Sequence, residues 1–443
     1  MTHETPPIES LPDGTLQHRH PVTGREVWNV PGRSFRPDRA RKGEHSPLPL
    51  ALSNDSKTRE EACDFCAGRR LETPPEKNRW WREDSGQWHS QSDRPPSQVT
   101  EGRCDFRRIA NLFEIIPYDY WALNLGFHPT RDRQSWRDEY LADETGRRHI
   151  ETLLRNKLKR AGWDSTRLSD WSPKDIRNLS EAFFFGSHDL LVSSRHYKPG
   201  AKMDTDIQSS GDLDPDAHYH YLLAASETAR DILAHNPLAR YAAIFQNWLS
   251  PAGASFEHLH KQILGSPRPG PYPEALEKAS HADPSFFNRR FLKPALGQKW
   301  LIASNPHAIA VAAFGIAYPA LWVFSKSRQS RPWELSAEEL KGFSDILHAC
   351  HAATGSNIPS NEEWAYRPPN STAPIPFHVT LKWRINIHAG YEGASGIAIS
   401  PMGPGELQKH LADRMKTLQS EGRLGSVDVA PNGADETLPD LEL

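Results

Sequence analysis

Cysteines and histidines are the residues of this chain whose types and spacing are best suited to chemistry. Cys63 and Cys66 form a Cys-x-x-Cys pair, and four cysteines in 443 residues do not make a disulfide framework. Two thiolates and two imidazoles are the ligand set of a closed tetrahedral zinc site. His196 and His258 are the best-placed histidines to complete it. His188 flanks the same expected strand as His196, so the residues alone leave that choice open.

A second cluster of polar residues lies around His258. If residues 258–264 form a strand, side chains alternate between its faces, so His258, His260 and Gln262 share one face. The preceding Gly-Ala-Ser contains small residues that let a backbone approach a phosphate, and Ser255 can donate a hydroxyl hydrogen bond. The pattern predicts a compact polar pocket in which His260 attacks a phosphorus atom. The alternative is a pair of satisfied surface or core histidines.

Three further side chains fit phosphate chemistry. Asn247 ends the preceding expected strand, and a hairpin-like return would bring it beside His260. Arg33 and Arg36 stand three apart in an extended or turn segment, and arginine forks suit bidentate contacts with phosphate. A solvated basic loop is the alternative interpretation of the two arginines.

The elements that must position these residues are a mixture of strands and helices. Expected strands cover residues 190–192, 241–245, 258–264, 308–314, 320–324, 377–387 and 396–399. Expected helices cover residues 216–235, 336–350 and 406–417; Asn236-Pro237 stops the first, and the capping box Ser336-Ala337-Glu338-Glu339 starts the second. Residues 76–102 are polar and are expected to form a long loop.

The chain is expected to contain two halves of similar strand and helix content. Proline and glycine concentrate in residues 267–273, which predicts a boundary there. We therefore expect an N-terminal domain over residues 21–268, holding the metal and catalytic residues, and a C-terminal domain over residues 274–419. Residues 1–20 are expected to be a flexible tail, and the acidic residues 420–443 a second one.

Composition narrows the class of protein. Charged residues make up 25% and hydrophobic residues 37%, and the formal net charge of −3 provides no basic field for nucleic acid. No apolar run approaches the roughly 20 residues that span a bilayer, so no membrane partner is expected. The polar N-terminus shows no secretory signal, and a cytoplasmic location is expected.

These motifs resemble the galactose-1-phosphate uridylyltransferase family, within the histidine-triad superfamily. The family's most specific pattern is an Asn followed by Gly-x-Ser-x-x-His-x-His-x-Gln. Thirteen residues separate the Asn from the second His, and here 260 − 247 = 13. Other matching stretches are Trp28 to Pro37, Cys63 to Glu76, Asn111-Leu112-Phe113, His188 to His196 and Gly390-Tyr391-Glu392. The resemblance implies an α+β fold with two histidine-triad-like halves, each an antiparallel sheet (half-barrel) with packed helices.

The resemblance also implies roles for individual residues. His260 is similar to the nucleophile that takes up a nucleoside monophosphate as a phosphoramidate. The ligands of one structural zinc would be Cys63, Cys66, His196 and His258, which selects His196 over His188. The implied substrate contacts are Asn247, Ser255 and Gln262 around the transferred phosphate, Arg33 and Arg36 at the other phosphate, Asn111 at the nucleoside and Glu392 at the sugar.

The implied activity is ping-pong transfer of UMP between a nucleotide-sugar and a sugar 1-phosphate by a homodimer, with the sugar left open. The alternatives are AMP transfer from an ADP-sugar or dinucleotide to phosphate, a histidine-triad hydrolase, and a zinc-stapled nucleotide-binding protein without turnover. Leu259 stands where the uridylyltransferases often have Pro, which leaves the nucleotide open, and Lys261 leaves the acceptor open. Pro376 replaces the first His of a second pair and only His378 stays in register, so no second metal site is expected.

Overall fold

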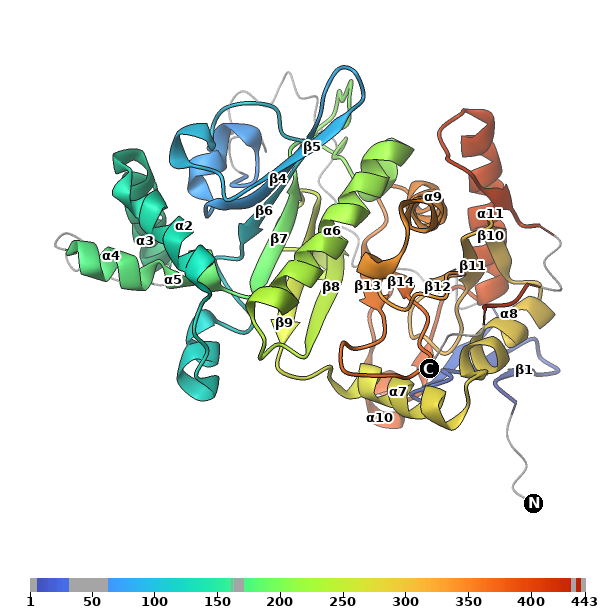
Figure 1. Cartoon of the computed structure of the whole chain (residues 1–443). Coiled ribbons are helices and arrows are strands. Elements are labelled where there is room, and N and C mark those ends of the chain that lie inside the picture. The colour runs from blue at the N-terminus through green and yellow to red at the C-terminus, as the bar shows by residue number, and fades with distance from the viewer. Residues whose placement is uncertain (1–5, 32–62, 161, 163–170, 432–435, 440–443) are drawn as a thin grey trace.

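The computed structural model describes residues 6–31, 63–160, 162, 171–431 and 436–439. These residues form an α+β protein built on a twelve-stranded antiparallel sheet with helices packed against it (Figure 1). A separate four-stranded sheet contains the strands closest to the N-terminus. The α+β class expected from the sequence, with antiparallel sheet and packed helices, is confirmed.

The large sheet runs across the molecule without a break. Its strands, in spatial order, are β16 (Asp428–Val429), β10 (Leu301–Ser304), β11 (Ala308–Ala312), β12 (Ala320–Ser325), β14 (His378–Trp383), β13 (Ser360–Ala365), β8 (Tyr241–Trp248), β9 (His260–Ser266), β7 (His188–Ser193), β6 (Phe106–Ala110), β4 (Glu76–Arg82) and β5 (Trp88–Ser92). In the middle, β13 pairs with β8 and sets Asn361 opposite Asn247.

The two sides of the β8–β13 junction repeat the same order of elements. On one side, β7 is followed by helix α6 (Pro215–His235), β8 and β9, and β9 inserts between β7 and β8. On the other side, β12 is followed by helix α9 (Ala337–Thr354), β13 and β14, and β14 inserts between β12 and β13. The described chain thus contains two topologically equivalent halves that share one sheet.

Helices α6 and α9 pack against each other and against the sheet near this junction (Figure 1). The Asp214 side chain accepts the backbone N–H of Ala217 at the start of α6, and Asn236-Pro237 follows its last residue. Ser336 and Glu339 form the predicted capping box at the start of α9. Local sequence therefore sets both ends of α6 and the start of α9, as predicted, whereas α9 continues to Thr354, beyond the expected residue 350.

The remaining α-helices fall into two groups, one in each half of the chain. Those of the first half are α2 (Arg131–Ala142), α3 (Glu144–Arg160), α4 (Pro173–Leu179) and α5 (Glu181–Phe185), and they enclose a second apolar core (Figure 1). Those of the second half are α7 (Pro271–Ala282), α8 (Lys293–Gly297), α10 (Gly390–Ser395) and α11 (Pro404–Ser420). The helix expected over residues 406–417 lies inside α11.

The prediction of a long loop over residues 76–102 is wrong. This segment contains the β4–β5 hairpin, which forms the edge of the sheet. The side chains of Glu76 and Arg79 are fully buried and form an ion pair with an N–O distance of 2.7 Å. Because these charges neutralise each other inside the protein, a segment of polar composition can form a buried strand here.

Parts of both expected tails form strands instead. In the N-terminal segment, β1 (Ile8–Ser10) and β2 (Leu16–Arg19) join β3 (Glu26–Asn29) and β15 (Ala398–Ile399) in the small sheet. In the C-terminal segment, β16 pairs with β10. Residues 8–19 and 428–429 thus differ from the flexible tails expected over 1–20 and 420–443. Strands of two to four residues at a sheet edge leave almost no periodic signal in sequence.

Candidate active site

A buried cluster of two cysteines and two histidines forms the first part of the site. One ligand atom each of Cys63, Cys66, His196 and His258 lies within 4.8 Å of the others. The measured sulfur to Nδ1 distances are 3.4, 3.6 and 3.7 Å, and the two Nδ1 atoms are 3.2 Å apart. Tetrahedral zinc, with bonds of about 2.3 Å to sulfur and about 2.0 Å to nitrogen, requires separations of about 3.5 and about 3.3 Å. The four residues therefore fit one zinc ion, and His196 rather than His188 joins them.

Hydrogen bonding prepares the cluster for a metal. His258 Nε2 lies 2.6 Å from the backbone oxygen of Ser193, which only accepts, so Nδ1 carries the lone pair that a metal requires. The hydrogen bond from Cys66 is the main reason that the pKa of the Cys63 thiol is lowered to about 2, against the opposing effect of burial. The thiolate form, which ligates zinc, is thereby favoured.

His260 is the first residue of β9 and follows the cluster directly. Its Nδ1 is 2.7 Å from the backbone oxygen of His258, so Nδ1 carries the proton and Nε2 carries the lone pair. The side chain is 5% exposed, and burial lowers its pKa to about 4. At neutral pH the site therefore holds an uncharged imidazole with a defined free nitrogen, which is the form that can act as a nucleophile.

The strand predicted over residues 258–264 starts two residues later than expected, although the rings of His258 and His260 both lie against Phe65. The strand starts at His260, and His258 lies before it in a bend. At this point the carbonyl of Leu259 accepts the N–H of Ser193 at 2.9 Å, while His258 turns toward the cysteines. His258 therefore joins the metal cluster from the segment just before β9.

Gln262 lies two residues beyond His260, on the same face of β9, and His188 orients its amide. The N–H of Ile115 donates to His188 Nδ1 at 3.1 Å, so Nε2 carries the proton and donates to Gln262 Oε1 at 3.1 Å. The amide NH₂ of Gln262 is left as a donor for a ligand. Asn111 donates its backbone N–H to the His188 carbonyl at 2.8 Å, which brings the predicted nucleoside contact close by.

The return of the chain from β8 to β9 brings Asn247 toward the nucleophile. The two strands are antiparallel neighbours in which Phe245 pairs with Gln262. Continued by two residues, this register sets Asn247 opposite His260. The hairpin-like return inferred from the sequence is therefore present.

The loop that connects these strands passes beside Asn247. Gly253 has a φ of +88°, and a Cβ at this glycine would lie 3.9 Å from Asn247 Nδ2. Leu249 has a φ of +65°, which is rare for a branched side chain and marks strain at the start of the loop. Ser255 is exposed in the same loop. The loop thus keeps its backbone and one hydroxyl open to a ligand.

Lys261 points to the opposite face of the sheet and is fully buried. Its Nζ lies 2.5 Å from Glu362 Oε1 on β13 and 3.2 Å from Gln246 Oε1 on β8. Trp364 and His351 also hydrogen-bond to the Glu362 carboxylate, at 2.5 and 2.7 Å. Lys261 therefore links the two halves of the sheet, and its buried ammonium cannot reach an acceptor substrate. The residues around Lys261 in the sequence did not indicate this structural role.

The other predicted contacts are not joined to this group. Arg33 and Arg36 lie outside the described residues. Glu392 lies in the first turn of α10, where its Oε2 accepts the N–H of Ala389 at 2.9 Å. Among the described residues, no hydrogen bond or ion pair connects Glu392 with His260 or Gln262.

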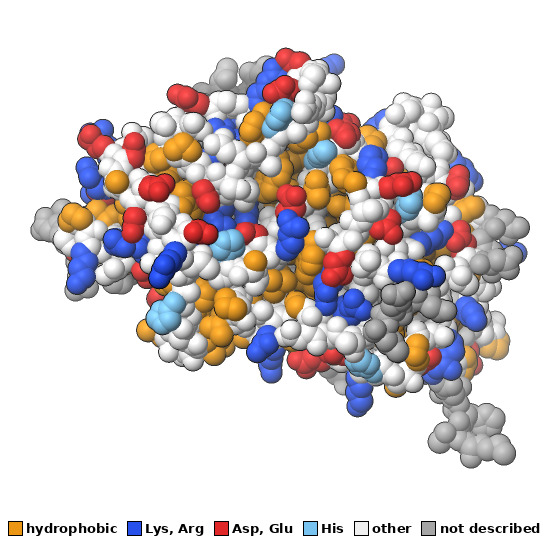
Figure 2. Space-filling view, in the orientation of Figure 1, with side chains coloured by type: hydrophobic (Ala, Val, Ile, Leu, Met, Phe, Trp, Pro, Cys, Tyr) orange, Lys and Arg blue, Asp and Glu red, His pale blue; other side chains and the backbone are white. Residues whose placement is uncertain are grey.

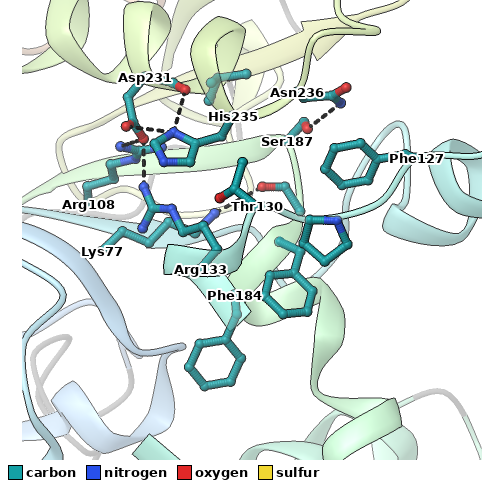
Figure 3. A pocket seen from close by; sticks show the side chains of 14 residues that line it. Lys77, Arg108, Phe127, Thr130, Arg133, Phe184, Ser187, Asp231, His235 and Asn236 are labelled. Carbon is teal, nitrogen blue, oxygen red and sulfur yellow. Dashed lines mark hydrogen bonds and ion pairs between the residues drawn. The ribbon is translucent and has the colours of Figure 1, made fainter. Parts of the chain in front are cut away.

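A hollow lies beside the C-terminal end of α6 (Figure 3), and His260 is not among the residues that line it. Its basic side chains are already neutralised by carboxylates. Lys77 Nζ is 2.7 Å from Asp189, and Arg108 is 2.5 Å from Asp231. The cations that line this hollow are therefore already paired within the protein.

The surface adds two observations. On the face shown in Figure 2, acidic and basic side chains are interspersed and form no continuous basic stripe. In the part of the chain that the structure describes, every helix is too short or too polar to cross a bilayer.

Comparison with known proteins places the fold and this site in a recognised class. The chain is 25% identical over 407 residues to ADP-glucose phosphorylase of Arabidopsis thaliana, which covers 88% of this chain and 90% of the relative. The crystal structure of an ADP-glucose phosphorylase from that plant with bound ADP-glucose has a TM-score of 0.54 and 18% identity, over 90% of this chain and 97% of that chain. A GalT-like protein from Arabidopsis thaliana has a TM-score of 0.52 and 18% identity, over 89% and 97% of the two chains. The chain therefore shares the fold of these proteins, and its sequence is similar to that of ADP-glucose phosphorylase.

The chain belongs to the family described as a domain of unknown function, DUF4921, which matches residues 11–435. The match covers nearly all of the chain, so the two halves and the cluster around His260 all fall within the family's extent. The resemblance inferred from the motifs is confirmed by these relatives.

Proposed function

We propose that this enzyme transfers AMP from an ADP-sugar to inorganic phosphate through a covalent AMP–His260 intermediate. The observation that carries the proposal is the fixed tautomer of His260, whose Nδ1 is bound to the His258 carbonyl at 2.7 Å. A single uncharged nitrogen, Nε2, is thereby left for attack beside amide donors that suit a phosphate.

The reaction has two steps through one pocket. In the first, His260 Nε2 forms a bond to the α-phosphorus, the bond from that phosphorus to the bridging oxygen breaks, and sugar 1-phosphate leaves with the electron pair. In the second, an oxygen of inorganic phosphate attacks the same phosphorus, the P–N bond breaks, and ADP leaves while the electron pair returns to Nε2. The Nδ1 proton stays on the ring and bonds to the His258 carbonyl, which stabilises the positive charge that the ring acquires.

Amide donors support the transferred phosphate. The Gln262 NH₂ group is free because its Oε1 accepts from His188. Asn247 and Ser255 border the same loop, and Arg33 and Arg36 are proposed to contact the phosphate that is not transferred. Loss of one such donor typically lowers the rate by about 10²–10³.

A zinc ion is proposed at the Cys63, Cys66, His196 and His258 cluster, where the ligand separations fit it. When bound, zinc would serve as a structural cross-link with no open coordination position. Because His258 is one ligand and its carbonyl holds His260 Nδ1, the cross-link fixes the position of the nucleophile. The C-terminal half offers no second ligand set among the described residues.

The choice of AMP over UMP is supported by the relatives. Sequence motifs favoured UMP transfer to a sugar 1-phosphate, whereas the ADP-glucose phosphorylase relative covers nearly the whole chain. Transfer of UMP remains the second candidate, since the pattern around His260 is shared with the uridylyltransferases.

The proposal is tested by intact-mass spectrometry after incubation with ADP-glucose and, separately, with UDP-glucose. We expect an acid-labile adduct of AMP mass from ADP-glucose that is absent in His260→Ala, while zinc content of the variant stays at that of the wild type. An adduct that forms only with UDP-glucose would mean that the transferred nucleotide is UMP and not AMP. No adduct from either donor would contradict covalent transfer.

A further inference from the structure

A row of polar side chains leads from the nucleophile into the C-terminal half. It crosses β9, β8 and β13 at His260, Asn247 and Asn361 in turn. Because neighbouring strands are about 4.8 Å apart, the row spans about 10 Å between the backbones of β9 and β13. A pyrophosphate with its attached sugar extends over a similar length.

Two contacts fix the orientation of the Asn361 amide. Its Nδ2 donates to the carbonyl of Ala252 at 2.8 Å, and a carbonyl can only accept. Arg384 Nη1 donates to Asn361 Oδ1 at 2.8 Å, and a guanidinium can only donate. The Asn361 amide therefore also donates to Asn247 Oδ1, at 2.7 Å, and leaves the Asn247 NH₂ directed to other partners.

Arg384 ends this row with a positive charge that no described carboxylate neutralises. Its guanidinium lies 4.4 Å from the ring centre of Tyr318, and its Nε is buried without a hydrogen-bond partner. Among the described residues, no ion pair involves Arg384. A guanidinium that is partly desolvated and unneutralised is destabilising unless an anion completes it.

The neighbouring lysine does not share this property. Lys382 occupies the same face of the sheet, but its Nζ is 2.7 Å from both carboxylate oxygens of Glu363. The available cation on this side of the site is therefore Arg384 rather than Lys382.

We propose that Arg384 binds the phosphate that is not transferred, which is the sugar phosphate leaving in the first step and inorganic phosphate entering in the second. This inference rests on the proposed function, since it adds Arg384 to Arg33 and Arg36 as a contact of the second phosphate in that reaction. The bidentate fork of arginine suits a phosphate dianion, and Asn361 together with Tyr318 holds the fork in place.

The experiment isolates the second step. Wild type, Arg384→Gln, Arg384→Lys and the matched control Arg240→Gln are charged with AMP from ADP-glucose, desalted, and mixed with increasing inorganic phosphate while the adduct is followed by mass. Arg240 is exposed and lies just before the first residue of β8, at the opposite end of that strand from Asn247.

Arg384→Gln is expected to raise the half-saturating phosphate concentration about ten- to hundredfold, the range for a lost hydrogen bond to a charged group. The maximal decay rate should change much less, Arg384→Lys should be intermediate, and Arg240→Gln should match the wild type. A purely structural role would lower stability and leave the half-saturating concentration unchanged, which would overturn the proposal.

If wild type forms no adduct, the proposed function fails independently, and calorimetric titration with inorganic phosphate then decides. Phosphate binding that is weaker in Arg384→Gln than in the wild type, but unchanged in Arg240→Gln, supports the anion site. Equal binding in the wild type and Arg384→Gln, or none in either, overturns it. If Arg384→Gln does not fold, Arg384→Lys replaces it in both experiments, and an unchanged phosphate dependence in that variant counts against the proposal.

Discussion

The two halves of the sheet each present a histidine at the start of the equivalent strand, and the surroundings of the two rings differ. His260 begins β9 and His378 begins β14. Each donates from Nδ1 to the carbonyl two residues earlier, at 2.7 Å to His258 and 2.8 Å to Pro376. The repeated topology therefore sets the tautomer of the imidazole twice.

The surroundings of the two rings differ. His378 is 0% exposed, and its ring packs against Phe287 and Phe324 with centroid distances of 5.3 and 5.1 Å. Its Nε2 is buried and has no hydrogen-bond partner. The free nitrogen of His378 thus faces a wall of aromatic rings, whereas that of His260 belongs to a polar site.

The residues that make this difference are few. Pro376 stands two residues before its histidine, where the catalytic half has the zinc-type ligand His258. Ala365 pairs with His378, whereas Asn247 lies opposite His260. The fold supplies a positioned imidazole in both halves, and a handful of polar neighbours turns only one of them into a candidate nucleophile.

The largest effect should follow removal of a metal ligand, because among the described residues only the half that contains His260 has such a cluster. Cys63→Ser should reduce bound zinc from one per chain toward zero and lower the melting temperature, since the binding energy of a structural zinc is part of the folding energy. Adduct formation at His260 should fall with it, at least a hundredfold. Metal analysis and calorimetry check this, and normal zinc stoichiometry in the variant would place the metal elsewhere.

A smaller effect is expected on the helix side of the same strands, where Lys261 follows His260 and Val379 follows His378. Lys261→Met should lower the free energy of unfolding by about 3–5 kcal/mol, because Glu362 would remain buried without its cation. The double variant Lys261→Met, Glu362→Leu serves as the control and should recover most of the loss. Denaturant unfolding measures both, and a single variant as stable as wild type would show that the ion pair does not hold the halves together.

The smallest effect should come from His378, and it should appear only in acid. Burial lowers the pKa of His378 to about 4, so between pH 6.5 and 4 the unfolded chain binds a proton that the folded chain does not. Stability contributed by this residue is complete above pH 6.5 and is lost as the pH falls toward 4. His378→Leu should therefore keep adduct formation and lie within about 1 kcal/mol of wild type at pH 7.

As the pH falls toward 4, the free energy of unfolding of this variant should decrease by up to about 3 kcal/mol less than that of the wild type. This difference corresponds to the lowered pKa of His378. Unfolding curves at several pH values between 7 and 4 give the comparison. Parallel pH profiles for the two proteins would mean that His378 does not titrate as its burial implies.

Sequence by itself determined the features that depend on near neighbours along the chain. The Cys63 and Cys66 pair, the motif ending at Gln262, the capping box at Ser336 and the stop after His235 were all readable, because spacing and local hydrogen bonding decide them. The superfamily resemblance followed from the same motifs.

Only the tertiary structure decided the features that depend on partners far away in the chain. His196 joins the metal cluster while His188 turns to Gln262, although both flank the same strand. Lys261 reaches Glu362 about a hundred residues later, and Asn361 with Arg384 extends the site into the other half. Side-chain direction and burial across paired strands set these contacts, and no periodicity within one strand encodes which distant strand will pair with it.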